Sequence, residues 1–262
     1  MVNFNHQYNF DQIILALEFV GEKIKDWRDD PEMKKIHVEK DFKTEADLKA
    51  HQIICEKLNE ITPGIGIISE EDYSHSDKRP DAYWIIDPID GTSSWYNGYY
   101  GFVTQVAYIE NDIPVFGAIH APVLKQTWSA LKGQGAYING EILPKLKADA
   151  RLILIDNTEK PHGIAKKMMK SLPITGYVEC GSLGLKTVLV ADGTVDLFIK
   201  DVCVRDWDLA PAAVILSEVG GYLIQANNTP YLFNGNYEKD NGFIVGRNMK
   251  IIEMALDVFK SK

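Results

Sequence analysis

An uninterrupted apolar run that ends in two closely spaced aspartates constrains the fold of this chain more than any other feature. Tyr83-Trp84-Ile85-Ile86 is typical of a strand that is buried on both faces, and Asp87-Pro88-Ile89-Asp90 follows it directly. A second apolar run, Gly66-Ile67-Ile68, leads in the same way into Ser69-Glu70-Glu71-Asp72. The sequence therefore predicts two buried strands, each of which stops at a group of carboxylates.

Hydrophobic periodicity predicts a mixed fold whose two halves differ. In the first half, Asn9 is expected to cap one amphipathic helix, and residues 45–61 form another. Short apolar segments separated by Asn, Pro and Gly turns predict an antiparallel meander with strands at residues 102–109, 115–120, 127–131 and 136–138. In the second half we expect strands at 152–155, 176–179 and 195–199 and helices at 161–170, 182–191, 207–219 and 249–259.

The fold class is thus α/β, with an α+β N-terminal half and an α/β C-terminal half. Because the composition changes near residues 140–150, we divide the chain into a subdomain of residues 1–145 and a subdomain of residues 146–262. The first holds the acidic motifs, and the second contributes Asp208 and substrate contacts. Asp208 is expected at a helix N-terminus, with Pro211 in the first turn, where no backbone donor is needed.

Composition excludes several classes of function. The 262 residues include 28 Lys and Arg against 37 Asp and Glu, and the net charge of -9 disfavours binding of a nucleic acid polymer. The three cysteines are odd in number and lack Cys-x-x-Cys spacing, which argues against a disulfide framework and a zinc site. No basic leader and no bilayer-length apolar stretch are visible, so we expect a cytoplasmic protein that does not bind membranes.

The clustered carboxylates indicate a divalent cation. Neighbouring carboxylates repel one another, so Asp87 with Asp90 and the Glu70-Glu71-Asp72 group need either bulk water or a cation. Carboxylate oxygens together with the Ile89 carbonyl suit Mg²⁺, which often completes its coordination with a substrate phosphate. The alternative is that Asp-Pro and Asp-Gly only mark a loop.

Gly91, Thr92 and Ser93 follow the aspartates immediately. If a helix starts here, its free N–H groups would donate hydrogen bonds to a phosphate that is bound beside the metal ligands. The alternative is that Thr92 or Ser93 only caps that helix, and the two interpretations are compatible.

These motifs resemble the inositol monophosphatase superfamily of magnesium-dependent, lithium-sensitive phosphatases. The first shared motif is Trp84-Ile85-Ile86-Asp87-Pro88-Ile89-Asp90-Gly91-Thr92, and the second is Trp207-Asp208-Leu209-Ala210 followed by an apolar helix and Gly220-Gly221. Thr44-Glu45-Ala46-Asp47 and Glu70-Glu71 complete the set. The resemblance covers nearly the whole chain and implies a layered αβαβα sandwich of the sugar-phosphatase type.

The resemblance also implies a role for each motif residue. Asp47 and Thr92 would form a hydrogen-bonded pair that, with Glu70, orients and deprotonates the attacking water. Glu71 would be a more outer ligand than Glu70, and the alternative is that Glu71 is a solvated residue at the end of its strand. The implied ligands of Mg²⁺ are Glu70, Asp87, the Ile89 carbonyl, Asp90 and Asp208.

Two branches of the family differ in substrate, and we favour the 3′(2′),5′-bisphosphate nucleotidases, which convert adenosine 3′,5′-bisphosphate to AMP and phosphate. Ala46-Asp47-Leu48-Lys49-Ala50-His51 and Ser69-Glu70-Glu71-Asp72 are similar to their motifs. Lys186 would pair with the second phosphate, although a lysine on an amphipathic helix is by default solvated. The aromatic residues from Trp95 to Tyr100 would form either core packing or a surface for stacking adenine.

The main alternative is an inositol-1-monophosphatase or a related sugar phosphatase. Asp201 favours it, because that branch often carries a glutamate near this position that contacts inositol hydroxyls. Ser93-Ser94-Trp95 also replaces the Lys-Glu-Phe of typical nucleotidases. A fructose-1,6-bisphosphatase and an inactive phosphate-binding or regulatory scaffold are further alternatives. In each enzymatic case the partner is a small phosphorylated molecule, and a homodimer is compatible with the sequence.

Overall fold

A computed structural model describes residues 6–38, 42–72, 78–147 and 151–260. Residues 148–150, next to the predicted subdomain boundary, lie outside this range. The division at residues 145 and 146 stays a prediction.

The first sheet has seven strands in the order β3-β4-β5-β6-β7-β8-β9, and only the β3–β4 pair is parallel. The predicted antiparallel meander from residue 102 onward is therefore confirmed. The strands are β3 (Gly66–Ser69), β4 (Ala82–Asp90), β5 (Val103–Glu110), β6 (Ile113–Ala121), β7 (Gln126–Leu131), β8 (Ala136–Ile138) and β9 (Glu141–Ile142).

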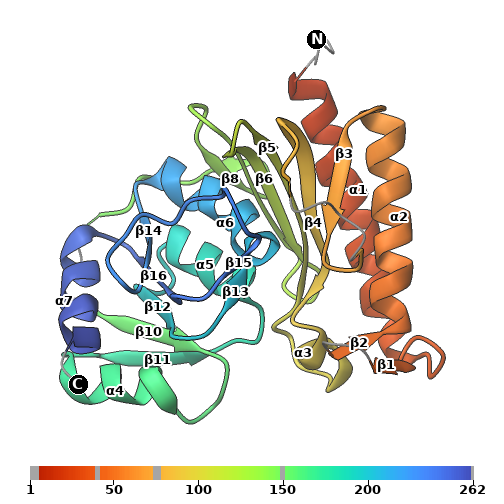
Figure 1. The fold of residues 1–262 in the computed structure, drawn as a ribbon. Coiled ribbons are helices and arrows are strands. Elements are labelled where there is room, and N and C mark those ends of the chain that lie inside the picture. The colour runs from red at the N-terminus through yellow and green to blue at the C-terminus, as the bar shows by residue number, and fades with distance from the viewer. Residues whose placement is uncertain (1–5, 39–41, 73–77, 148–150, 261–262) are drawn as a thin grey trace.

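Helices cover both faces of this sheet (Figure 1). On the outer face lie α1 (His6–Asp26) and α2 (Glu45–Ile61), which pack apolar side chains onto β4, β5 and β6. On the inner face lie α5 (Leu183–Ala191) and α6 (Asp206–Val219). α6 approaches β6 so closely that a Cβ on Gly117 would lie 2.2 Å from the Pro211 carbonyl oxygen, so glycine is required there.

The second sheet has five strands in the order β11-β10-β12-β16-β14, with β10 parallel to β11 and β12 and the other pairs antiparallel. α5 lies on its inner face, and α4 (Gly163–Ser171) and α7 (Met249–Lys260) cover the outer face. The layers are thus α, β, α, β and α, which confirms the predicted sandwich. The strands are β10 (Ile153–Asp156), β11 (Gly176–Glu179), β12 (Leu197–Lys200), β14 (Tyr222–Gln225) and β16 (Phe243–Gly246).

Short elements complete the structure. A 3₁₀ turn, η1 (Trp27–Asp29), follows α1, and the helix α3 (Thr92–Tyr96) follows β4. Two small ribbons pair β1 (Ile36–Val38) with β2 (Phe42–Thr44) and β13 (Val204–Arg205) with β15 (Glu238–Lys239). In the part of the chain that the structure describes, no helix is both long and apolar enough to cross a bilayer.

Three local predictions are wrong. α1 already includes His6, so Asn9 lies inside the helix and does not cap it. β4 does not stop before Asp87 but continues to Asp90, because a bulge between Asp87 and Asp90 shifts the register with β5 and keeps both residues in the sheet. Pro211 lies one turn inside α6, beyond the first turn.

Candidate active site

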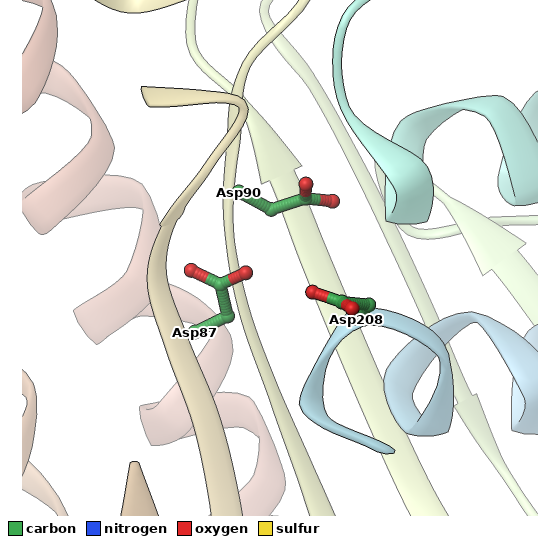
Figure 2. A group of neighbouring side chains, drawn as sticks. All are labelled: Asp87, Asp90 and Asp208. Atoms are coloured by element: carbon green, nitrogen blue, oxygen red, sulfur yellow. The ribbon is translucent and has the colours of Figure 1, made fainter. Parts of the chain in front are cut away.

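The bulge in β4 turns Asp87 and Asp90 toward the N-terminus of α6. One carboxylate oxygen from each of Asp87, Asp90 and Asp208 lies within 4.8 Å of the others. Figure 2 shows the three side chains converging from β4 and from the first turn of α6. The structure therefore brings together residues 87, 90 and 208, which the family resemblance places among the metal ligands.

The N-terminus of α5 holds the Asp90 carboxylate. The backbone N–H groups of Leu183 and Gly184 donate to it at 3.1 and 2.6 Å, and the Ser182 hydroxyl lies 2.5 Å from Oδ2. The positive end of the helix dipole adds to these hydrogen bonds. Sequence analysis missed these donors, because nothing in the sequence indicates that residue 90 meets the helix that starts at residue 183.

Asp47 and Asp208 occupy equivalent positions in their helices. Each is the third residue of its helix and accepts a hydrogen bond at 2.8 Å from the backbone N–H of the preceding N-cap residue, Thr44 for Asp47 and Arg205 for Asp208. This reciprocal bond is half of a capping box and fixes the carboxylate against its own backbone. One oxygen of each aspartate is thus anchored at the start of its own helix.

The free oxygen of Asp47 meets Thr92. The Thr92 hydroxyl lies 2.9 Å from Asp47 Oδ1 and 3.0 Å from the Ile89 carbonyl oxygen, and its single proton is donated to one of them at a time. The N-cap of α3 is Gly91, whose φ of 93° lies in the left-handed region, so neither Thr92 nor Ser93 is the N-cap. The capping interpretation is wrong, and the hydroxyl of Thr92 belongs to the site.

Lys43 and Arg205 surround the two glutamates with positive charge. Lys43 donates to the Glu70 carbonyl oxygen at 2.7 Å and lies 3.2 Å from the Glu71 carboxylate, and both of these side chains are buried. Arg205 lies 3.7 Å from the Glu70 carboxylate, which is partly exposed. The carboxylate of Glu71 thus faces Lys43 and that of Glu70 faces Arg205, and the role of Lys43 was not predicted.

Burial and mutual repulsion raise the pKa of the acidic groups in the site. Burial is the larger cause for Asp87, and Glu70, Asp90 and Asp208 add to it. Burial, and then the charge of Asp90, raise the pKa of Asp208 from 3.8 to about 7. Burial likewise raises the pKa of Asp90, although the donors from α5 oppose this. In the absence of a cation, protons compensate for part of the negative charge.

The donor set fits a hard divalent cation. Carboxylate and carbonyl oxygens are the ligands that Mg²⁺ and Ca²⁺ prefer, whereas zinc is usually bound by His and Cys. In the described part of the chain, the one cluster that could hold a metal consists of these three aspartates. The cysteines are all free and none belongs to the cluster.

A cleft of about 610 Å³ opens beside Asp90. Asp90, Gly91, Thr92 and Ser93 form one side of it. The second sheet and its loops form the other side with Asp156, Asn157, His162, Lys200 and Asp201.

Lys186 does not have the solvated side chain expected by default. It is fully buried in α5, and its Nζ donates to the Cys180 and Gly181 carbonyl oxygens at 3.0 and 2.9 Å and to the Asn157 side chain. Its contact with a second phosphate stays a prediction. Trp95 is also fully buried and donates to the Ile24 carbonyl oxygen, so it packs in the core and cannot stack on a base.

Residues 10–260 match the sequence model of the Inositol monophosphatase family. The chain belongs to this family. Its members are metal-dependent phosphatases, so the chain is an enzyme of that class, and the alternative of an inactive scaffold is not supported.

Curated relatives from both substrate branches are similar to this chain. A 3′(2′),5′-bisphosphate nucleotidase CysQ from Aggregatibacter actinomycetemcomitans is 37% identical over 201 residues, covering 73% of this chain and 74% of the relative. A fructose-1,6-bisphosphatase/inositol-1-monophosphatase from Thermotoga maritima is 30% identical over 232 residues, covering 85% and 87%.

Solved structures agree with the fold. An inositol monophosphatase from Thermotoga maritima superposes with a TM-score of 0.81 at 26% identity, covering 97% of this chain and 98% of its own. CysQ from Bacteroides thetaiotaomicron superposes with a TM-score of 0.80 at 25% identity, covering 94% and 100%.

Asp208 links the stability of the metal-free protein to pH. In the folded protein this carboxyl keeps its proton up to about pH 7, whereas in the unfolded chain its pKa returns to 3.8. Between these values the folded state binds more protons, so the contribution of Asp208 to stability falls as the pH rises. Because a cation replaces that proton, we predict that magnesium chloride raises the melting temperature more at about pH 8 than at about pH 5.

Calorimetry with and without the salt measures this difference. At about 100 times the dissociation constant we expect a shift of about 5–10 °C at the higher pH. Asp208→Asn should lose most of the shift, and Asp201→Asn, which alters a cleft carboxylate outside the cluster, should keep it. Equal shifts at both pH values, or a full shift in Asp208→Asn, would contradict the assignment.

Proposed function

We propose that this protein is a Mg²⁺-dependent 3′(2′),5′-bisphosphate nucleotidase that converts adenosine 3′,5′-bisphosphate to AMP and phosphate. The convergence of Asp87, Asp90 and Asp208 beside the Asp47–Thr92 pair carries the phosphatase part of the proposal. The 37% identity to a CysQ nucleotidase supports the choice of substrate.

We assign Glu70, Asp87, the Ile89 carbonyl, Asp90 and Asp208 as the groups that would hold Mg²⁺. When bound there, Mg²⁺ supplies charge that activates water and stabilises phosphate and leaving-group oxygens. Glu71 is assigned a supporting role, because its ion pair with Lys43 fixes the segment that carries Glu70.

The Asp47–Thr92 pair would place the attacking water. When Thr92 donates its proton to Asp47, the lone pairs of the hydroxyl are free to accept a hydrogen bond from water. Glu70 would share in orienting and deprotonating this water. The backbone N–H groups of Gly91, Thr92 and Ser93 would receive the transferred phosphate. No covalent intermediate is needed.

The far wall of the cleft supports a substrate with a second anionic group. Lys200 lines that wall beside Asp156, with which it forms an ion pair. Lys186 lies beneath it and adds positive charge, and a direct bond from Lys186 to phosphate would require its Nζ to exchange one of its present acceptors. We therefore add Lys200 to Lys186 as a candidate partner of the second phosphate.

Inositol 1-phosphate is the second candidate substrate. Asp201 is exposed on the cleft, where its carboxylate could accept hydrogen bonds from the hydroxyls of a polyol. The relative from Thermotoga maritima, named a fructose-1,6-bisphosphatase/inositol-1-monophosphatase, supports this alternative. A homodimeric assembly and a cytoplasmic location stay predictions.

Thr92→Ala tests the proposed role of the hydroxyl. We expect kcat to fall by about a hundredfold or more with a much smaller change in KM, because the hydroxyl orients water and not substrate. Thr92→Ser keeps the hydroxyl and should retain most of the activity. Steady-state kinetics at saturating Mg²⁺ measure this, and a Thr92→Ala enzyme with near-normal kcat would refute the assignment.

A comparison of substrates tests the nucleotidase proposal. Adenosine 3′,5′-bisphosphate should have a higher kcat/KM than inositol 1-phosphate. Lys200→Met should lower kcat/KM for the bisphosphate by about tenfold to a hundredfold, since a hydrogen bond between charged groups contributes about 1.5–3 kcal/mol, and should change that for inositol 1-phosphate little. If inositol 1-phosphate is the faster substrate and Asp201→Ala selectively impairs it, the second candidate is correct.

A further inference from the structure

The amide group of Gln105 lies directly behind the aspartate cluster. Gln105 is fully buried on β5, and its Nε2 has three acceptors within hydrogen-bonding distance. These are Asp90 Oδ2 at 3.4 Å, the Trp207 carbonyl oxygen at 3.1 Å and the Asp208 carbonyl oxygen at 3.4 Å. One side chain thus contacts both segments that carry the aspartates.

Pro211 explains why the Trp207 carbonyl needs a donor from outside its helix. In an α-helix each carbonyl accepts from the N–H four residues later, and for Trp207 that residue is Pro211, which has no N–H. The Gln105 amide supplies this missing hydrogen bond. The same amide lies 3.4 Å from Asp90, so one side chain connects the first turn of α6 to the end of β4.

The surroundings fix the orientation of the amide. If Oε1 and Nε2 were exchanged, an oxygen would face three oxygen acceptors, which is repulsive. In the orientation observed, Oε1 lies against Gly184, where a Cβ would be 2.1 Å from it, and it is buried with no hydrogen-bond partner among the described residues. Leaving an amide oxygen buried in this way is unfavourable. In this arrangement Nε2 donates toward the acidic cluster, and Oε1 is left without a hydrogen-bond donor among the described residues.

We propose that Gln105 is a positioning residue that sets the separation of Asp90 and the first turn of α6 before a cation binds. A neutral donor is suited to this place, because it joins the two segments without adding charge to the cluster. Ligands held in position by such outer contacts bind metal more tightly, and loss of one contact typically weakens affinity about tenfold to a hundredfold. The inference rests on the proposed cation site and not on the choice of substrate.

Gln105→Met tests the proposal, because methionine has a similar length but no donor. Titration of the metal-free protein with Mg²⁺ by calorimetry, without substrate, should show affinity weakened about tenfold. The matched control is Thr104→Val, which alters a buried polar residue on the opposite face of the same strand. It should leave the affinity within about twofold of wild type.

The double variant Pro211→Ala, Gln105→Met distinguishes two roles of Gln105. One is positioning Asp90 relative to α6, and the other is only supplying the hydrogen bond that the Trp207 carbonyl lacks. Alanine restores the N–H that Trp207 lacks, so the melting temperature in EDTA should return close to that of wild type while the Mg²⁺ affinity stays about tenfold weaker. Recovery of the affinity together with the stability would overturn the proposal.

The proposal would also be overturned if Gln105→Met bound Mg²⁺ as tightly as wild type, if Thr104→Val weakened the Mg²⁺ affinity as much as Gln105→Met does, or if the wild type bound no Mg²⁺. A wrong substrate assignment would affect none of these readouts.

Discussion

Two distant segments of the chain place three carboxylates at one point, where Asp87 and Asp90 are buried and Asp208 is half-buried, and the repulsion among these carboxylates constrains the surrounding structure. Asp87 and Asp90 come from the end of β4, and Asp208 comes from a helix more than a hundred residues later in the chain. Buried carboxylates in such proximity are unfavourable unless donors, protons or a cation compensate. The raised pKa of each of these three aspartates reflects this unfavourable state in the protein without a cation.

Helix N-termini supply much of the compensation, and the layered fold is what brings them there. α2 and α6 each anchor an aspartate at their third position, and α5 directs its first N–H groups at Asp90. α5 and α6 lie between the two sheets, so they reach the end of β4 from one side, while α2 reaches it from the other (Figure 1). The groups that meet at this point therefore come from the first three layers, which are the outer helices, the first sheet and the helices between the two sheets.

Local features of the sequence were sufficient to predict the parts of this arrangement that depend on neighbouring residues. The bounds of α2 follow from periodicity, and the pairing of Asp87 with Asp90 follows from their spacing in one short motif, whereas only the resemblance to a known family placed Asp208 with them. The prediction did less well where distant residues decide the conformation. β4 continues past Asp87 because β5 pairs with it, and Lys186 is buried because acceptors from two loops surround its Nζ.

The residues that sequence analysis missed act across the layers. Lys43, Ser182 and Gln105 contact the site through partners far away in the chain, and none of them belongs to a charged or acidic motif. Strands β14 and β16 were also missed. Pro211 was predicted in the first turn of its helix and lies beyond that turn. A proline inside a helix leaves one carbonyl without its N–H donor, so a donor from elsewhere in the chain could have been expected, and the buried Gln105 amide supplies it.

The three aspartates Asp87, Asp90 and Asp208 are expected to bind a divalent cation between them. Anomalous diffraction at the manganese absorption edge, from crystals of the protein soaked with Mn²⁺, locates such a cation. We expect a strong anomalous peak within about 2.6 Å of an oxygen of each aspartate, the upper end of the distances at which carboxylates bind hard divalent cations. A peak at a different site, or none at this cluster while the protein is active, would contradict this expectation.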